Sequence, residues 1–179
     1  MEAVLAGHTP LVFVLPTGGG KSLLFMAPAC LEDPGVTVVV APFRALLGNL
    51  VGRMKEAGID CIEWRAGEVN PAAVVVVSAD RAVEWGFLDY ASQLNRDGLL
   101  RRVVIDECHL TFTLSDWRPK LAQLKHLRLL RCPMVLLTAT LPPLLEQELA
   151  EAMLVPLATY VRAGTVRANT LTERTSPFA

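Results

Sequence analysis

The sequence predicts an α/β domain built on a mostly parallel sheet with helices on both faces, and three observations support this fold class. Short apolar runs rich in β-branched residues alternate along the chain with helix-like segments. These runs are almost continuously apolar, as expected of strands buried on both faces. Gly, Pro, Asp or Asn bounds each run. Because ligands of such folds bind at the carboxyl ends of the strands, a site is expected just after an apolar run.

Strands are expected where the apolar runs fall, with a weaker candidate at 59–63. The stronger runs are 11–15, 36–41, 74–78, 102–105 and 134–138. Between them, helices are expected at 21–30, 44–57, 87–96, 119–131 and 143–153. The segment 44–57 places five apolar residues on one face, which are Leu46, Leu47, Leu50, Val51 and Met54. In 119–131, Pro119 suits a first helical turn, and leucine recurs at 121, 124, 127 and 130.

Composition limits the class of protein. A chain of 179 residues corresponds to about one domain, and 52% hydrophobic residues indicate a folded globule. The formal net charge of −1 excludes a globally basic nucleic-acid binder, so any such contact must be local. The longest apolar runs are too short to span a bilayer, and no secretory signal is visible, so we expect no membrane partner. Four widely spaced cysteines without a CxxC pair fit reduced thiols in an intracellular protein.

A glycine-rich segment, PTGGGKS, follows the first expected strand. Glycines let backbone N–H groups curl around a phosphate, and the helix that follows adds free N–H groups. Lys21 then reaches the phosphates and the Ser22 hydroxyl ligates magnesium. Leu15 stands where the strict pattern GxxxxGK[ST] has its first glycine, so a flexible turn is the alternative. The flanking strand and helix favour a phosphate site, with these residues in it: Thr17, Gly18, Gly19, Gly20, Lys21 and Ser22.

An acidic pair, Asp106 and Glu107, follows the run at 102–105. Asp106 is expected to hold the magnesium that bridges the phosphates, and Glu107 to deprotonate the attacking water. The alternative is an acidic loop with solvated side chains. The phosphate loop argues against that alternative, because a carboxylate on a neighbouring strand end is what its metal requires.

Three motifs in this order resemble helicase motifs I, II and III of the DEAD/DEAH-like superfamily 2: LPTGGGKS, DECH and LTAT. Leu15 and the segment HLTFTLSDWRP resemble the RecQ-type branch, which carries an aromatic-rich loop after motif II. APFRALLGNL and SADRAV lie where motifs Ia and Ib are expected. LTATLPP and the later VRAGTVRANT are similar to helicase-like genes near fungal telomeres. The resemblance covers nearly the whole chain.

The resemblance implies a RecA-like P-loop NTPase domain that uses ATP and Mg²⁺. It implies catalytic roles for Lys21, Asp106 and Glu107, with Ser22 and Asp106 at the metal. His109 is expected to couple the nucleotide site to Thr138 and Thr140, since a neutral imidazole accepts a hydrogen bond from a hydroxyl.

The resemblance also implies contacts with single-stranded or forked DNA. Backbone contacts independent of base sequence suit a protein that moves along a strand. The expected contact residues are Phe43, Arg44, Ser78, Asp80, Trp117 and Arg118. Phe112, with Trp117 and Arg118, is a further candidate for sensing single-stranded DNA. Ordinary packing is the alternative for Phe112 and Trp117, and packing is the expectation for Trp64 and Trp85.

The expected domain organisation is an ATP-binding domain at 1–161 that begins after the adenine-recognition motif of such helicases. A polar tail at 162–179, poorly ordered, would lead to a second RecA-like domain missing from this chain. That second domain would supply an arginine finger, which contributes roughly 10³–10⁵ in rate. We therefore expect weak ATPase activity and no unwinding by the chain alone.

Three functions remain open from the sequence. The first is the ATPase domain of a nuclear RecQ-like 3′–5′ DNA helicase. The second is a P-loop kinase or transport ATPase, in which the DECH and LTAT segments are not expected. The third is an inert helicase fragment that binds only nucleotide, or nothing.

Overall fold

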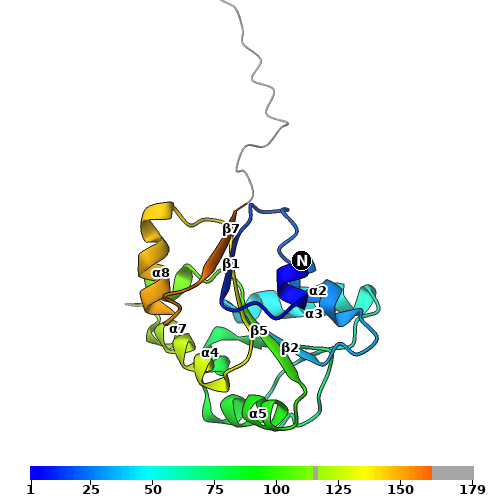
Figure 1. Ribbon diagram of the computed structural model, residues 1–179. Helices are drawn as coiled ribbons and strands as arrows, with labels where there is room; N and C mark the ends of the chain where they lie inside the picture. The colour runs from blue at the N-terminus through cyan, green and yellow to red at the C-terminus, as the bar shows by residue number, and fades with distance from the viewer. Residues whose placement is uncertain (115–116, 163–179) are drawn as a thin grey trace, which may run out of the picture.

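The computed structural model describes residues 1–114 and 117–162, which form a twisted sheet with helices on both faces (Figure 1). Within these residues the sheet has seven strands in the order β3-β4-β2-β5-β6-β1-β7, and all neighbouring pairs are parallel. The strands are β1 (Leu11–Val14), β2 (Val36–Ala41), β3 (Cys61–Glu63), β4 (Val74–Ser78), β5 (Leu100–Ile105), β6 (Met134–Thr138) and β7 (Thr159–Arg162). The predicted α/β fold class is confirmed.

Two hydrophobic cores lie on opposite faces of this sheet, because successive side chains of a strand alternate between its faces. In β2, Val38 and Val40 join one core, and Val39 and Ala41 join the other. The second core is covered by α1 (Glu2–Leu5), α2 (Leu23–Ala29) and α3 (Arg44–Glu56). The first core is covered by α4 (Ala79–Ala82), α5 (Trp85–Arg96), α7 (Pro119–Ala122), η1 (Gln123–Leu130) and α8 (Glu146–Ala152). The short segments α6 (Leu110–Thr113) and η2 (Pro143–Leu145) complete the described helices.

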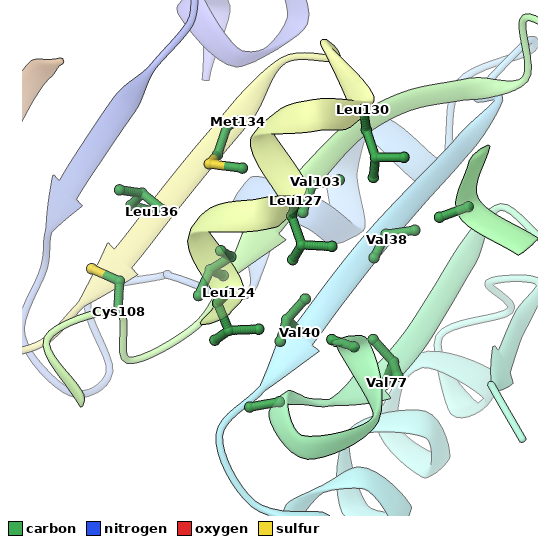
Figure 2. Close-up of a cluster of buried hydrophobic side chains, with 14 of the residues drawn as sticks. Val38, Val40, Val77, Val103, Cys108, Leu124, Leu127, Leu130, Met134 and Leu136 are labelled. Atoms are coloured by element: carbon green, nitrogen blue, oxygen red, sulfur yellow. The ribbon is translucent and has the colours of Figure 1, made fainter. Parts of the chain in front are cut away.

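The leucine-rich segment predicted as one helix at 119–131 is instead a short α-helix followed by a 3₁₀-helix, α7 and η1. Leucines spaced by three residues line up when a helix has 3.0 residues per turn, which is the 3₁₀ geometry. Leu124, Leu127 and Leu130 are all buried (Figure 2). They lie over the sheet near Val38, Val40 and Val103. Packing of the leucines against the sheet therefore accounts for this helix type.

Two further differences from the sequence expectations lie at exposed positions. On α3, Leu47 and Met54 are buried as expected, but Leu46 is exposed, so the buried face is narrower than the sequence indicated. β7 was not predicted, because Thr159–Arg162 are mostly exposed and have no run of apolar residues. Arg162 is the last residue of β7, one residue beyond the expected domain boundary. The rest of the expected tail, 163–179, lies outside the described residues.

The described helices include none that is both long enough and apolar enough to cross a membrane. All four cysteines are free thiols, and Cys61 and Cys108 are buried. Burial raises the pKa of the Cys61 thiol to about 11 and raises the pKa of Cys108 further, so both are protonated packing groups near neutral pH.

Candidate functional site

The sheet order brings three sequence motifs together at the carboxyl ends of adjacent strands. β5, β6 and β1 are neighbours, and they end at the acidic pair, at Thr138 and at the glycine loop respectively. Backbone hydrogen bonds join these ends: the Leu15 N–H donates to the Thr138 carbonyl (3.0 Å), and the Cys108 N–H donates to the Leu137 carbonyl (2.9 Å). The relative positions of the three motifs are thus set by the sheet itself.

Each of the three consecutive glycines is needed by the backbone of the loop. Gly18 and Gly20 have φ of +78° and +81°, a region that L side chains rarely adopt. A Cβ on Gly19 would lie 2.8 Å from the Pro16 carbonyl oxygen, which already accepts the Gly19 N–H. The loop is a tight, exposed turn that leads directly to Lys21 and Ser22, and α2 then begins at Leu23. This geometry suits close approach of a phosphate to backbone N–H groups.

The Lys21 ammonium pairs with the Glu107 carboxylate, with 2.9 Å between Nζ and Oε1. Both side chains are largely withdrawn from solvent, with 15% and 27% of their surface exposed. The other Glu107 oxygen, Oε2, accepts the Ala139 N–H at 3.3 Å. Glu107 itself has φ of +47°, which is uncommon outside glycine and often marks a functional position. Glu107 therefore links the phosphate loop to the end of β6.

Asp106 lies beside this pair and accepts the Glu107 N–H through Oδ1 (3.0 Å). Burial, and to a lesser degree the Glu107 charge, raises the pKa of the Asp106 carboxyl above its ordinary value. Such a carboxylate fits a divalent cation, which would offset the desolvation. Mg²⁺ at a nucleotide keeps few protein ligands, so Ser22 and Asp106 suffice as candidates. No cluster of three or more His, Cys, Asp or Glu side chains that could hold a metal occurs in 1–114 and 117–162.

His109 lies 2.8 Å from the Thr138 hydroxyl through Nδ1, and 3.5 Å from Glu107 Oε2. The Thr138 hydroxyl also donates to the Thr140 carbonyl (3.1 Å) and accepts the Thr140 N–H (3.2 Å). Since a hydroxyl has one proton, this arrangement favours Nδ1–H of His109 as the donor to Thr138, the reverse of the direction expected from sequence. Burial lowers the pKa of His109, so the ring is neutral near pH 7.

Four of the six residues expected to contact nucleic acid form a group: Arg118, its partners Asp80 and Phe43, and its sequence neighbour Trp117. Arg118 donates to Asp80 Oδ2 (2.6 Å) and to the Pro42 carbonyl (3.1 Å), and it lies 5.0 Å from the ring centre of Phe43. Its neighbour Trp117 is 86% exposed, so core packing does not explain that side chain. By contrast, Phe112 packs against the core.

The remaining two expected residues differ in exposure. Arg44 is exposed at the start of α3, next to Phe43. Ser78 is fully buried at the end of β4, and its hydroxyl has no partner within the described part of the chain. Its side chain would contact a nucleic acid only after a local opening, so the structure does not bring Ser78 together with the others.

The two tryptophans assigned to packing behave differently. Trp64 is 2% exposed and packs edge-on against Phe87, as expected. Trp85 is 84% exposed at the start of α5, so the packing assignment is wrong for this residue. Its sequence context, EWGF, has no apolar spacing that would have distinguished exposure from burial.

The parallel sheet and the three motifs on its adjacent strand ends define a RecA-like P-loop domain. Residues 1–147 match the family model of the DEAD/DEAH box helicase, and the chain belongs to this family. Similar proteins include RecQ-like DNA helicase blm-1 of Caenorhabditis elegans, 36% identical over 166 residues, and RecQ-like DNA helicase BLM of Xenopus laevis, 29% identical over 168 residues. These alignments cover 79% and 83% of the chain but only 16% and 12% of the relatives.

Solved structures agree on the fold. A hypothetical ATP-dependent RNA helicase from Sulfolobus tokodaii and the DUF1998 helicase MrfA bound to DNA both superpose with a TM-score of 0.63 over 90% of the chain. The chain covers 50% and 26% of these two structures, at 21% and 18% identity. The finer expectation, a fungal telomere-linked type, stays a prediction.

Proposed function

We propose that this chain is the ATP-hydrolysing first RecA-like domain of a RecQ-like DNA helicase, which couples hydrolysis to 3′–5′ movement along DNA. The observation that carries this proposal is the Lys21–Glu107 pair at the glycine loop, with Glu107 also tied to the end of β6. This geometry supports the proposal, because the cation that would bind phosphate and the candidate general base lie within one hydrogen bond of each other.

The proposed chemistry divides among the residues of the site. The backbone of Gly18, Gly19 and Gly20 and the Lys21 ammonium bind the nucleotide phosphates. Ser22 and Asp106 would hold Mg²⁺, which neutralises charge on those phosphates. When the phosphates take up Lys21, the Glu107 carboxylate is released to orient the attacking water and accept its proton.

The proposed nucleic-acid partner is single-stranded or forked DNA in the nucleus. Phe43, Arg44, Trp117 and Arg118 offer aromatic faces and cations, a combination that binds single strands without reading their sequence. Asp80 would position Arg118 through their ion pair. His109, Thr138 and Thr140 are proposed to transmit nucleotide state, since they join the base Glu107 to the end of β6.

We further propose that residues 1–161 act with a second RecA-like domain. In P-loop NTPases an arginine supplied in cis or in trans stabilises the transition state, and it contributes about 10³–10⁵ in rate. The 179-residue chain alone is therefore expected to hydrolyse ATP slowly and to separate no duplex in a strand-displacement assay.

ATP affinity and DNA-stimulated hydrolysis test the proposal. We expect Lys21→Ala to weaken ATP binding about 10-fold or more, because it removes a charged partner of the phosphates. Lys55→Ala, at an exposed position of α3, is the matched control and should bind as the parent does. Hydrolysis by the parent should rise when single-stranded DNA is added.

Two results would contradict the proposal. Hydrolysis indifferent to DNA would favour a P-loop kinase or transport ATPase. Equal, negligible ATP binding by the parent and Lys21→Ala would favour an inert fragment.

A further inference from the structure

Trp85 is an exposed aromatic side chain outside the proposed sites. It starts α5 with 84% of its surface exposed, almost the same exposure as Trp117. An indole this exposed contributes little to the core, so its presence is not explained by folding. Large aromatic side chains are enriched where proteins bind their partners.

A run of charged side chains joins Trp85 to Trp117 across the surface. We call this run the ion-pair ladder, and it consists of Asp80, Glu84, Arg118 and Lys120. Arg118 pairs with Asp80 at 2.6 Å. The Lys120 ammonium then lies 3.4 Å from both the Asp80 carbonyl and the Glu84 carboxylate. Each end of the ladder is next in sequence to an exposed tryptophan, since Trp117 precedes Arg118 and Trp85 follows Glu84.

The elements that carry the ladder pack together on one face of the sheet. α4 contacts both α5 and α7, and the three helices lie on the same side in Figure 1. The segments that carry the two tryptophans and the ladder are therefore neighbours on one face of the sheet, although about thirty residues separate the tryptophans in the sequence.

We propose that Trp85 is a second stacking contact for single-stranded nucleic acid, reached along the ion-pair ladder from Trp117. This inference rests on the proposed function, because it extends the same surface. A base stacks on the Trp85 indole, and a phosphate replaces the Glu84 carboxylate as the partner of Lys120. Lys120 and Glu84 are 49% and 46% exposed, and such a solvent-screened pair exchanges partners at little cost.

The pattern of the surface favours a single strand over a protein partner. A protein interface has an apolar centre with charges at its rim. Here the cations Arg118 and Lys120 belong to the same group of segments as the two exposed tryptophans, and cations with aromatic side chains suit the phosphates and bases of a strand. Trp85 thus matches a nucleotide beyond those near Trp117.

Binding of a fluorescein-labelled oligo(dT) to the 179-residue chain, followed by anisotropy, tests the inference. Trp85→Ala is expected to lower affinity about 10-fold, in the range found for loss of one base-stacking side chain. Trp85→Phe keeps an aromatic face and should retain most of the affinity. Leu144→Ala removes a side chain that is 93% exposed on η2 and serves as the matched control, with no change expected.

Tryptophan fluorescence gives a second readout that a structural role would not move. In Trp117→Phe the remaining indoles are Trp64, which is buried, and Trp85. Oligo(dT) should still quench part of this emission, and the quenching should vanish in the Trp85→Phe/Trp117→Phe double variant.

The possible failures are distinguishable. If Trp85→Ala binds oligo(dT) as the parent does while Trp117→Ala binds weakly, the inference is overturned and the proposed function stands. If the parent chain binds no oligo(dT), both are overturned.

Discussion

Two cation–carboxylate pairs organise this domain, and they differ in what holds them in place. Lys21–Glu107 (2.9 Å) joins the loop after β1 to the end of β5, with β6 between these two strands, and 15% and 27% of the two side chains are exposed. Arg118–Asp80 (2.6 Å) joins the residue before α7 to a residue of α4, and 25% and 36% of the two side chains are exposed. The first pair is fixed by the sheet, whereas the second depends on packing between α4 and α7. The difference suggests that the first pair serves chemistry and the second serves an exchangeable partner.

The surroundings of the two pairs support this interpretation. Glu107 has a second backbone contact at Ala139 and an uncommon positive φ, so its carboxylate has little freedom. Arg118 is held by the Pro42 carbonyl and lies over the Phe43 ring. A guanidinium on an exposed aromatic face remains available to a phosphate. Changes at the two pairs should therefore affect different measurements.

The largest effect is expected from Glu107→Gln, which preserves shape but removes the base. Loss of a general base costs about 10²–10⁴ in rate, so single-turnover hydrolysis of ATP should fall by that factor. ATP binding should persist, because Lys21 remains and loses its competing carboxylate. Glu148→Gln, at an exposed position of α8, is the control. A hydrolysis rate equal to that of the parent would show that Glu107 is not the base.

A smaller effect is expected from Arg118→Ala, and it should appear in the dependence of ATP hydrolysis on DNA concentration. Loss of the guanidinium should raise the DNA concentration that half-saturates ATP hydrolysis about 5- to 10-fold, as expected for one charged hydrogen-bonding group. Arg96→Ala, an exposed arginine at the end of α5, should leave this concentration unchanged. If Arg118→Ala instead slowed single-turnover hydrolysis at saturating DNA as strongly as Glu107→Gln, the contrast between the two pairs would be lost.

The sequence alone predicted the features that depend on buried strands and missed those that depend on packing at the surface. The loop at 15–22 and the acidic pair were predictable, because buried strands leave continuous apolar runs and their ends mark the site. The 3₁₀ form of η1 was not predicted, although its three-residue leucine spacing contained the signal. β7 has mostly exposed residues and no apolar run, so it gave no signal. The burial of Ser78 and the exposure of Trp85 gave no signal in the sequence, because exposure near a strand end or a helix start depends on tertiary packing. The packing expectation for Trp85 was wrong, whereas the nucleic-acid contact of Ser78 stays a prediction.

The smallest expected effect concerns stability and comes from Asp106→Asn. The pKa of Asp106 is raised in the folded chain, chiefly by burial, so folding disfavours its ionised form. The asparagine keeps an oxygen to accept the Glu107 N–H but carries no charge. At pH 7.5 we therefore expect the variant to be more stable than the parent by about 0.5–2 kcal/mol in urea unfolding.

The pH dependence and the metal separate this explanation from a general packing effect. A raised carboxyl pKa penalises the fold fully at pH values above the folded pKa, and the penalty disappears as pH falls towards the ordinary aspartate value. The stability advantage of Asp106→Asn should thus shrink between pH 7.5 and pH 4.5, while Asp89→Asn, an exposed position on α5, should show no such change. With Mg²⁺ and ATP present, the parent should gain stability that the variant does not. If the stability advantage of Asp106→Asn depended on neither pH nor Mg²⁺-ATP, Asp106 would not be an ionised carboxylate that holds a metal. The strand-end site would then be no more specialised for chemistry than the Arg118–Asp80 pair.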